Sequence, residues 1–247
     1  GLANRRASHL PDTAAPMTVT PATPWTRELF ARMRTLFWLK GLGTTLWVWV
    51  FFIGYFHTLR HPAYPVTVMP LTAVDAWVPF LSWMLVPYLS LWVYVGIAPG
   101  LLRSFRPLLV YGLWSGALCL AGLAIFHFWP TQIPPLAVQT TAPGFALLQG
   151  IDAAGNACPS MHVAISVFTG LWVERTLRFI GAPPWLRVIN AVWLLAICLS
   201  TMAVRQHVAL DVLGGVLLGG AFAWASLRWS PAEGLLTGAG RKDERLS

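Results

Sequence analysis

A histidine and an aspartate stand four residues apart in a stretch that is otherwise free of charged side chains. They are His207 and Asp211, and the stretch runs from residue 207 to residue 227 of the 247-residue chain. On a helix, residues at this spacing share one face, one turn apart. The carboxylate can then accept a hydrogen bond from one imidazole nitrogen and leave the other free to act as a nucleophile or a base. A simpler interpretation also stands, in which the pair only satisfies itself at a helix end.

A second histidine opens another apolar segment. It ends the sequence Cys158-Pro159-Ser160-Met161-His162. Proline is favoured in the first turn of a helix and serine caps helix N-termini, so we expect His162 at the start of a helix. Helix N-termini offer free backbone N–H groups and the positive end of a dipole to an anion. Two such termini, two histidines and an orienting carboxylate suit phosphoryl transfer, in which one histidine attacks phosphorus and the other protonates the leaving oxygen.

Six apolar segments must position these residues. They cover residues 41–59, 77–100, 108–129, 161–180, 188–204 and 207–229. A bilayer core needs roughly 20 apolar residues per helix, so the expected fold class is all-α, a polytopic membrane protein with a bundle of six transmembrane helices. The segment 161–180 is the weakest of the six because Glu174, Arg175 and Arg178 occupy its last turns. Those side chains can reach the interface, and a five-span alternative stays open.

Composition excludes an ordinary soluble domain. Hydrophobic residues make up 56% of the chain and charged residues only 11%, against roughly 25% charged in soluble domains. The net charge of +8 would suit a protein that binds nucleic acid, but its distribution indicates a membrane topology instead. With the N-terminus inside, Arg60 and Arg205 are the two outward residues among 17 Lys and Arg. The positive-inside rule then places both termini in the cytoplasm and residues 60–76, 130–160 and 203–206 outside. No nucleic-acid partner is expected.

The ends of the chain differ in composition from its middle. Residues 1–25 are rich in Pro, Ala and Thr, which is typical of a disordered tail, and residues 26–40 predict an amphipathic helix at the membrane interface. We therefore expect a cytoplasmic tail and interfacial helix over 1–40, a membrane domain over 41–229 and a cytoplasmic tail over 230–247. Arg5-Arg6 has no apolar run behind it, so no export signal is expected there. The expected location is the inner (plasma) membrane, with the histidines at the non-cytoplasmic face.

The two histidine motifs together resemble those of a known family. Pro-Ser-Met-His at 159–162 is followed by His-x-x-x-Asp-Val-Leu-Gly-Gly at 207–215, and over residues 156–220 this combination resembles the type 2 phosphatidic acid phosphatase superfamily. The resemblance implies a six-span bundle that acts on a membrane lipid phosphate or diphosphate. It also implies that His207 is the nucleophile that forms a phosphohistidine, that Asp211 orients it, and that His162 is the general acid. Phosphohistidine chemistry needs no metal, so no metal or other cofactor is expected.

Three departures from the family pattern point towards one branch of it. Met161 replaces a glycine of the family, and Thr201 stands where the family has its phosphate-binding arginine. The family's first motif, a lysine with Arg-Pro seven residues later, lacks its lysine, since Pro99 occupies that position. We interpret Arg106-Pro107 as a coincidence, because the expected topology places it on the cytoplasmic side. Sphingomyelin and inositol phosphorylceramide synthases are similar in lacking these arginine motifs, so a lipid head-group phosphotransferase is the alternative to a phosphatase.

The missing arginine leaves the phosphate without an assigned cation. Arg205 lies two residues before His207, and if the fifth predicted helix continues it sits about 6 Å beyond Thr201 on the same face. We therefore expect Arg205 to bind the phosphate, together with Ser160 and Thr201. Asp75 is interpreted as a loop or cap residue of an outward loop.

Two other classes of protein stay open. A haem-bearing electron carrier would use His127, His162 or His207 as axial ligands, but it does not explain Asp211 one turn from His207. A transporter would have an ionisable site near the middle of the membrane, whereas the candidates here lie near one face. The sequence leaves open which lipid is the substrate, whether its phosphate goes to water or to another alcohol, and which oligomer forms.

Overall fold

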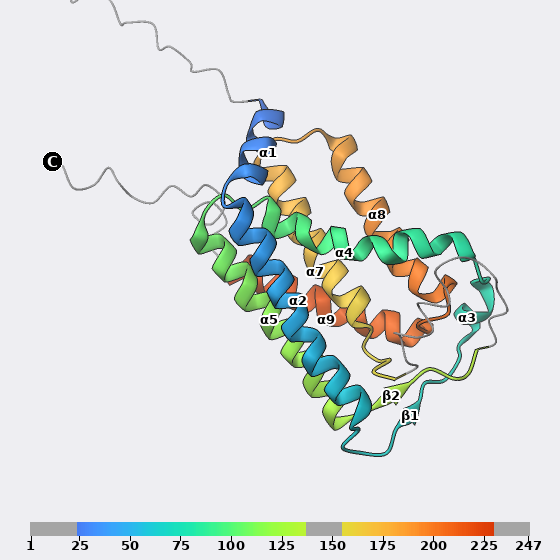
Figure 1. Cartoon of the computed structure of the whole chain (residues 1–247). Coiled ribbons are helices and arrows are strands. Elements are labelled where there is room, and N and C mark those ends of the chain that lie inside the picture. The colour runs from blue at the N-terminus through green and yellow to red at the C-terminus, as the bar shows by residue number, and fades with distance from the viewer. Residues whose placement is uncertain (1–23, 137–154, 230–247) are drawn as a thin grey trace, which may run out of the picture.

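The structure is a computed structural model that describes residues 24–136 and 155–229. The chain is mostly helical there, with two short strands (Figure 1). Its elements are α1 (Trp25–Arg34), α2 (Phe37–Arg60), β1 (Thr67–Val68), α3 (Ala73–Trp77), η1 (Ser82–Met84), α4 (Leu85–Gly100), α5 (Phe105–Phe128), β2 (Thr131–Gln132), α7 (Met161–Phe179), α8 (Pro184–Ala203) and α9 (Ala209–Trp229). Nearly all of the predicted tails and most of the predicted outward loop 130–160 lie outside the described residues.

Five stretches of this chain are long and apolar enough to cross a membrane. They are α2, η1 with α4, α5, α8 and α9. Each coincides with one of the six predicted segments, and together they indicate an integral membrane protein. The sixth segment forms α7, a helix of 19 residues that carries three charged side chains in its last turns. Five of the six predicted segments are thus confirmed as helices that are long and apolar enough to span a membrane, and the sixth span stays a prediction.

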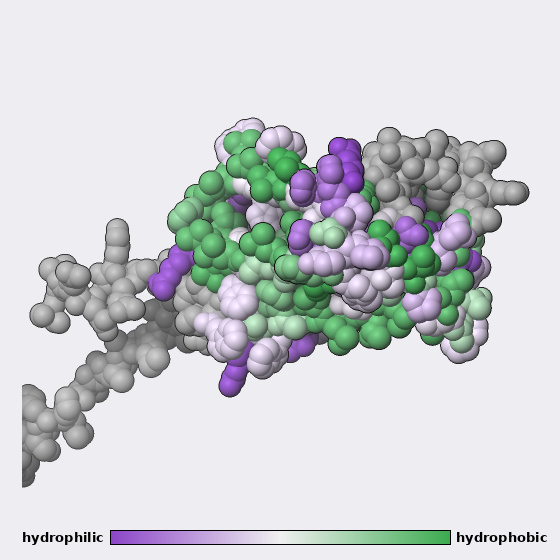
Figure 2. Space-filling model, turned by 90° about the horizontal axis from the view of Figure 1, so that it is seen from below, coloured by the Kyte–Doolittle hydropathy of each residue, from purple (hydrophilic) through white to green (hydrophobic). Residues whose placement is uncertain are grey.

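α7 is the central helix of the bundle. It packs against α4, α5, α8 and α9, and most of its side chains, including Phe168 and Trp172, are buried. α2 lies against α4 and α5 and exposes large apolar side chains such as Trp49. Figure 2 shows that much of the visible surface is hydrophobic, with hydrophilic residues gathered in patches. A helix enclosed by its neighbours has little contact with lipid, which explains how α7 can carry more charge than the helices around it.

Two glycines bring α9 against the start of α7. A Cβ atom on Gly215 would lie 2.5 Å from the carbonyl oxygen of Ser160, and one on Gly219 would overlap the carbonyl of Ala164. Small residues of this kind let helix backbones approach closely inside membranes. The two helix starts are also joined directly, because the Ser160 N–H donates to the Asp211 carbonyl at 2.9 Å. This close contact places Asp211 beside the first turn of α7.

Short strands and loops support the segment that leads into α7. β1 and β2 pair in parallel, with Thr67 opposite Thr131. The Thr131 hydroxyl accepts from the Cys158 N–H at 2.8 Å, and the Asn156 side-chain amide donates to the Tyr55 carbonyl of α2 at 2.9 Å. These bonds join α2, β2 and the approach to α7 into one frame.

α1 lies at the opposite end of the bundle from β1 and β2 (Figure 1). The sequence predicted one amphipathic helix over residues 26–40, whereas in the structure α1 ends at Arg34 and α2 begins at Phe37. The break falls at Leu36, whose φ of 55° is in the left-handed region, a conformation that a right-handed helix cannot continue through. Lys40 therefore belongs to α2, and Arg32 of α1 is only 1% exposed.

Candidate active site

His207 and Asp211 form the pair that their spacing predicts. The Nδ1 atom of His207 lies 3.4 Å from Oδ2 of Asp211, and the aspartate side chain is completely buried whereas the imidazole is 13% exposed. His207 itself precedes α9, which begins at Ala209, so the two side chains meet at the helix start rather than along a helix face. Because Nδ1 is turned to the carboxylate, Nε2 is the ring nitrogen left for chemistry.

Hydrogen bonds to the main chain fix the turn that carries His207. The carbonyl oxygen of Thr201 accepts from the N–H groups of Gln206 and His207, at 3.0 and 3.1 Å. Oδ2 of Asp211 also accepts from the Val208 N–H at 3.0 Å, which is the contact that the acidic residue of a capping box makes. The same carboxylate thus caps α9 and holds the imidazole, so the orientation of His207 is tied to the helix.

His162 lies in the first turn of α7, as the sequence predicted. Ser160 is the N-cap, and its hydroxyl accepts from the Val163 N–H at 3.3 Å. The imidazole stacks on Tyr88 of α4, with 4.2 Å between the ring centroids and 18° between the planes. His162 and His207 line the same cavity. The starts of α4 and α7 and the turn between α8 and α9 therefore bring the two histidines together.

Two buried side-chain atoms in the described part of the chain have no hydrogen-bond partner. They are Nε2 of His162 and Oδ1 of Asp211. A buried polar group without a partner costs roughly 1–3 kcal/mol, and each such group in a native structure calls for an explanation. Both belong to residues that the sequence singled out for their chemistry, and a ligand or an ordered water is the kind of partner that satisfies such atoms.

The cavity beside the histidines has a volume of about 920 Å³, within the usual range of small-molecule sites. Its walls come from α2, α4, α5 and α7, and they are mostly apolar. His162 and His207 line it together with Tyr55 and Asn156 from the β1–β2 end of the bundle, and Lys40 lines it from the α1 end. A polar end joined to apolar walls suits an amphiphilic ligand.

Arg205 lies in the tight turn that the sequence predicted, but not on the predicted helical face. α8 ends at Ala203, and Arg205 has a φ of 61°. The helix therefore stops before Arg205, so the condition under which Arg205 would extend the Thr201 face is not met. Within the described residues, the guanidinium of Arg205 has neither an acidic partner nor a side-chain hydrogen bond. A half-exposed cation without a partner, two residues from His207, remains suited to binding an anion.

Ser160 and Thr201, which the sequence expects to bind substrate, are both completely buried. The Ser160 hydroxyl caps α7, and the Thr201 hydroxyl donates to the Cys198 carbonyl at 2.8 Å. Each side chain therefore has a partner in the main chain and helps to fix the backbone beside a histidine. That they also contact substrate stays a prediction.

Asp75 is a site component that sequence reasoning missed. Its Oδ2 accepts from the N–H and the hydroxyl of Thr72, at 2.7 and 2.8 Å, as expected for a cap. Its Oδ1 accepts from the Ala209 N–H at 2.7 Å, although Ala209 is 134 residues away and two residues after His207. The Thr-x-x-Asp pattern at 72–75 could have revealed the cap, but nothing in the sequence reveals the second contact.

The two carboxylates correct another expectation from the sequence. The start of α9 was predicted to offer free N–H groups to a phosphate, yet Asp211 takes the Val208 N–H and Asp75 takes the Ala209 N–H. Two negative charges at this helix start oppose the binding of an anion there. A bound phosphate therefore depends more on Arg205 and on the start of α7 than the sequence indicated.

Several other residues from the sequence analysis lie outside the site or serve to pack it. The Met161 side chain occupies space that Gly122 of α5 leaves open. Arg106 is exposed at the start of α5, at the end of the bundle away from β2. This position supports the interpretation that the likeness of Arg106-Pro107 to the family's first motif is a coincidence. Burial raises the pKa of the Cys158 thiol to about 11, so it is protonated at neutral pH and a poor nucleophile. His127 contacts Tyr64 and Phe128 rather than either site histidine.

No metal-ligand cluster is present in residues 24–136 or 155–229, where no three His, Cys, Asp or Glu side chains are grouped to hold an ion. The family model of the PAP2 superfamily matches residues 108–235. That range is more than half of the chain and contains His162, His207 and Asp211, but neither Asp75 nor Lys40. No curated protein and no solved structure matches the chain.

Proposed function

Because the chain belongs to the PAP2 superfamily, we propose that it is a membrane lipid phosphatase that cleaves a phosphate ester or diphosphate through a phosphohistidine on His207. One observation carries the proposal. Nδ1 of His207 is held by Asp211, while Nε2 of His162 is buried without a partner in the described chain and belongs to the same cavity. An oriented nucleophile beside a second titratable group is the arrangement that covalent phosphoryl transfer needs.

The reaction has two steps. In the first, Nε2 of His207 attacks phosphorus, the bond from phosphorus to the leaving oxygen breaks, and His162 gives its proton to that oxygen. The Nδ1–H of His207 stays hydrogen-bonded to Asp211, whose charge stabilises the phosphorylated ring. In the second step water attacks phosphorus, the bond from phosphorus to Nε2 of His207 breaks, His162 takes a proton from the water, and inorganic phosphate leaves.

Arg205 binds the phosphate oxygens in this proposal. The described residues offer its guanidinium no acidic partner, and the turn that contains it also carries His207. Arg60, the other cation at this end, lies over the Phe56 ring, 5.4 Å from its centroid. Although Ser160 takes the Val163 N–H, the start of α7 still adds a positive dipole end beside His162.

The proposed topology has six spans, with both termini in the cytoplasm and the histidines at the non-cytoplasmic face. Ten of the twelve described Lys and Arg residues support it, because they lie on α1, at the start of α2, in the α4–α5 link, around the α7–α8 link or at the end of α9. Arg60 and Arg205 are the remaining two. This excess of Lys and Arg at the α1 end of the bundle is expected when that end faces the cytoplasm. In this topology α7 completes the set of six spans, is the fourth of them along the chain, and is enclosed by its neighbours.

A head-group phosphotransferase is the second candidate, and one observation favours it. Thr201, at the position of the family's phosphate-binding arginine, is buried with its hydroxyl bonded to the main chain, so the site lacks that phosphatase cation. The first step would be the same, and the alcohol of a second lipid would replace water in the second.

A phosphate-release screen of the purified protein tests the proposal. The substrates are phosphatidate, phosphatidylglycerol phosphate, a polyprenyl diphosphate and a phospholipid with an intact head group, each with and without an added alcohol acceptor. Release of phosphate without acceptor supports the phosphatase, and turnover only with acceptor supports the phosphotransferase. Failure to turn over any of them in either condition would contradict both.

Trapping the covalent intermediate tests the roles of the histidines. His207→Ala should abolish both turnover and acid-labile phosphoenzyme, since it removes the nucleophile. His162→Ala should slow turnover while phosphoenzyme still forms from a substrate with a good leaving group. If His207→Ala keeps near-normal activity and His162→Ala does not, the roles are reversed and the proposal is wrong.

A further inference from the structure

One face of α2 lines the cavity along almost the whole helix. The residues concerned are Leu39, Lys40, Gly43, Thr44, Trp47, Val48, Phe51, Phe52, Tyr55 and Phe56. They recur every four residues, which keeps them on one side of a helix. From Lys40 to Phe56 the stripe is about 24 Å long at 1.5 Å per residue. The cavity is therefore an elongated groove rather than a compact pocket.

The groove changes in character along its length. His162 and His207 line it at the end where Asn156 binds Tyr55. Its middle is formed by apolar side chains such as Phe51 of α2 and Leu91 of α4. At the α1 end the ammonium group of Lys40 donates to the carbonyls of Arg32 and Gly100, at 2.7 and 2.9 Å, so its charge is already compensated by the protein.

Several side chains in the lining also face outward. Leu89 is 44% exposed, Trp92 49% and Leu113 64%, and all three lie on helices that are candidate spans. Apolar surface of this kind on a membrane helix faces hydrocarbon. A chain from the surrounding lipid can therefore enter the groove sideways, without leaving an apolar environment.

We propose that this groove binds one hydrocarbon chain of the substrate lipid, with the phosphate at His162 and His207 and the chain running toward Lys40. The inference rests on the proposed function and adds to it how the enzyme holds its substrate. A small water-soluble phosphate would leave the apolar groove unused. A second charged group on the ligand would meet no partner in the apolar middle, and burying it there is costly.

Two glycines allow the groove to be filled without disturbing the protein. Gly112 of α5 and Gly43 of α2 both line it, and a Cβ atom on either would meet nothing within 4 Å. Gly96 of α4 has the same open surroundings but does not line the groove. Gly96→Leu is therefore a matched control for Gly112→Leu and for the double variant Gly43→Leu/Gly112→Leu.

The experiment compares a long-chain substrate with a water-soluble short-chain phosphate ester. Filling the groove should lower kcat/KM for the long-chain substrate by roughly 15- to 60-fold, which corresponds to lost contact for about two or three methylene groups. The short-chain substrate should change less than about twofold, because the histidines are untouched, and Gly96→Leu should change neither. Equal losses on both substrates, or no loss on the long-chain substrate, would overturn the chain site while leaving the phosphatase proposal standing.

A binding measurement covers the case in which no phosphate ester is turned over. A phospholipid with a photoreactive group in its chain should label peptides of α2 and α5 in the wild-type protein and in Gly96→Leu. Labelling should fall in the double variant. Undiminished labelling there, or labelling spread over all lipid-facing helices, would show that the groove is not a chain site, whatever the outcome of the activity screen.

Discussion

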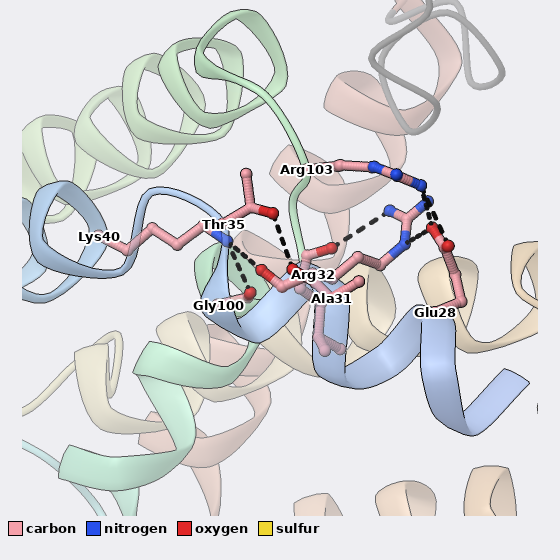
Figure 3. Close-up of polar contacts among 8 residues, drawn as sticks. Glu28, Ala31, Arg32, Thr35, Lys40, Gly100 and Arg103 are labelled. Carbon is pink, nitrogen blue, oxygen red and sulfur yellow. Dashed lines mark hydrogen bonds and ion pairs between the residues drawn. The ribbon is translucent and has the colours of Figure 1, made fainter.

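The two ends of the groove both hold buried polar side chains, and they differ in whether those side chains are satisfied. At the histidine end, Nε2 of His162 and Oδ1 of Asp211 lack partners within the described residues. At the α1 end, the buried cations Arg32 and Lys40 both have hydrogen-bond partners (Figure 3). Arg32 donates to the Glu28 carboxylate at 2.8 Å and to the Leu101 carbonyl at 3.2 Å. Glu28 also accepts from Arg103 at 3.0 Å.

The difference separates a site from a structural contact. The cations at the α1 end bind carbonyls of Gly100 and Leu101, at the end of α4, where helix carbonyls lack partners and a cation is favourable. Arg32 and Lys40 thereby dock α1 and α2 onto α4. The histidine end leaves two buried polar atoms without a partner in the described residues. Burial of charge is common to both ends, so these unsatisfied atoms are the reason for which the proposed reaction is assigned to the histidine end.

The largest expected effect is at Asp211. Asp211→Asn should lower kcat by roughly 1,000- to 10,000-fold, as the analogous change does in the serine-protease triad, because the amide no longer fixes the tautomer of His207. Steady-state kinetics on the substrate from the screen measures it. A loss of kcat below tenfold would mean that Asp211 only caps α9. The histidine end would then be a structural contact, like the α1 end.

The next effect is at Arg205. Arg205→Ala should lower turnover by roughly 100- to 1,000-fold, the usual cost of one donor to the transition state. Arg60→Ala is the control at the same end of the bundle, and it should have a much smaller effect because Arg60 lies over Phe56. Full activity in both variants would show that the first turn of α7 holds the phosphate without either arginine.

A smaller effect is expected at Asp75, which acts on His207 only through the main chain. Asp75→Ala should lower kcat by roughly 10-fold with little change in KM, since it removes a charged acceptor from Ala209. Asp75→Asn should recover part of the loss, because an amide oxygen can still accept that N–H. Thr72→Ala disturbs the α3 cap but not the contact with Ala209. If Thr72→Ala lowers kcat as much as Asp75→Ala does, the role of Asp75 is confined to α3.

The smallest effect on activity is expected at the α1 end. Arg32→Met should leave kcat within about twofold but lower the free energy of unfolding by about 2–3 kcal/mol, below the usual cost of breaking a buried ion pair because Glu28 keeps Arg103. Thermal unfolding in detergent measures it, with the exposed Arg34→Met on the same helix as the control. A large loss of kcat without a loss of stability would make this cluster part of the site.

The sequence alone was informative where function depends on neighbours in the chain. Asp211 is four positions after His207, and the Val163 N–H that Ser160 caps is three positions after Ser160. The local geometry of both pairs therefore follows once the helix starts are known. Membrane helices are equally local, because a run of apolar residues long enough for the bilayer can form all of its hydrogen bonds internally. These patterns were sufficient to place His162 at a helix start, to pair His207 with Asp211 and to find five of the candidate spans.

Tertiary structure decided what depends on which helices meet. Nothing in the spacing of Asp75 indicates that it binds the Ala209 N–H. In the sequence Arg32 resembles an interfacial anchor, whereas in the structure it is buried and donates to the Leu101 carbonyl at the end of α4. Whether Arg205 shares a face with Thr201 depended on where α8 ends, and the structure ends it at Ala203, before Arg205. The groove along α2 likewise depends on how α2 lies against α4 and α5, because side chains of all three helices line it. Contacts between distant residues depend on how closely backbones approach, as at Gly215 and Gly219, and a linear pattern does not contain that distance.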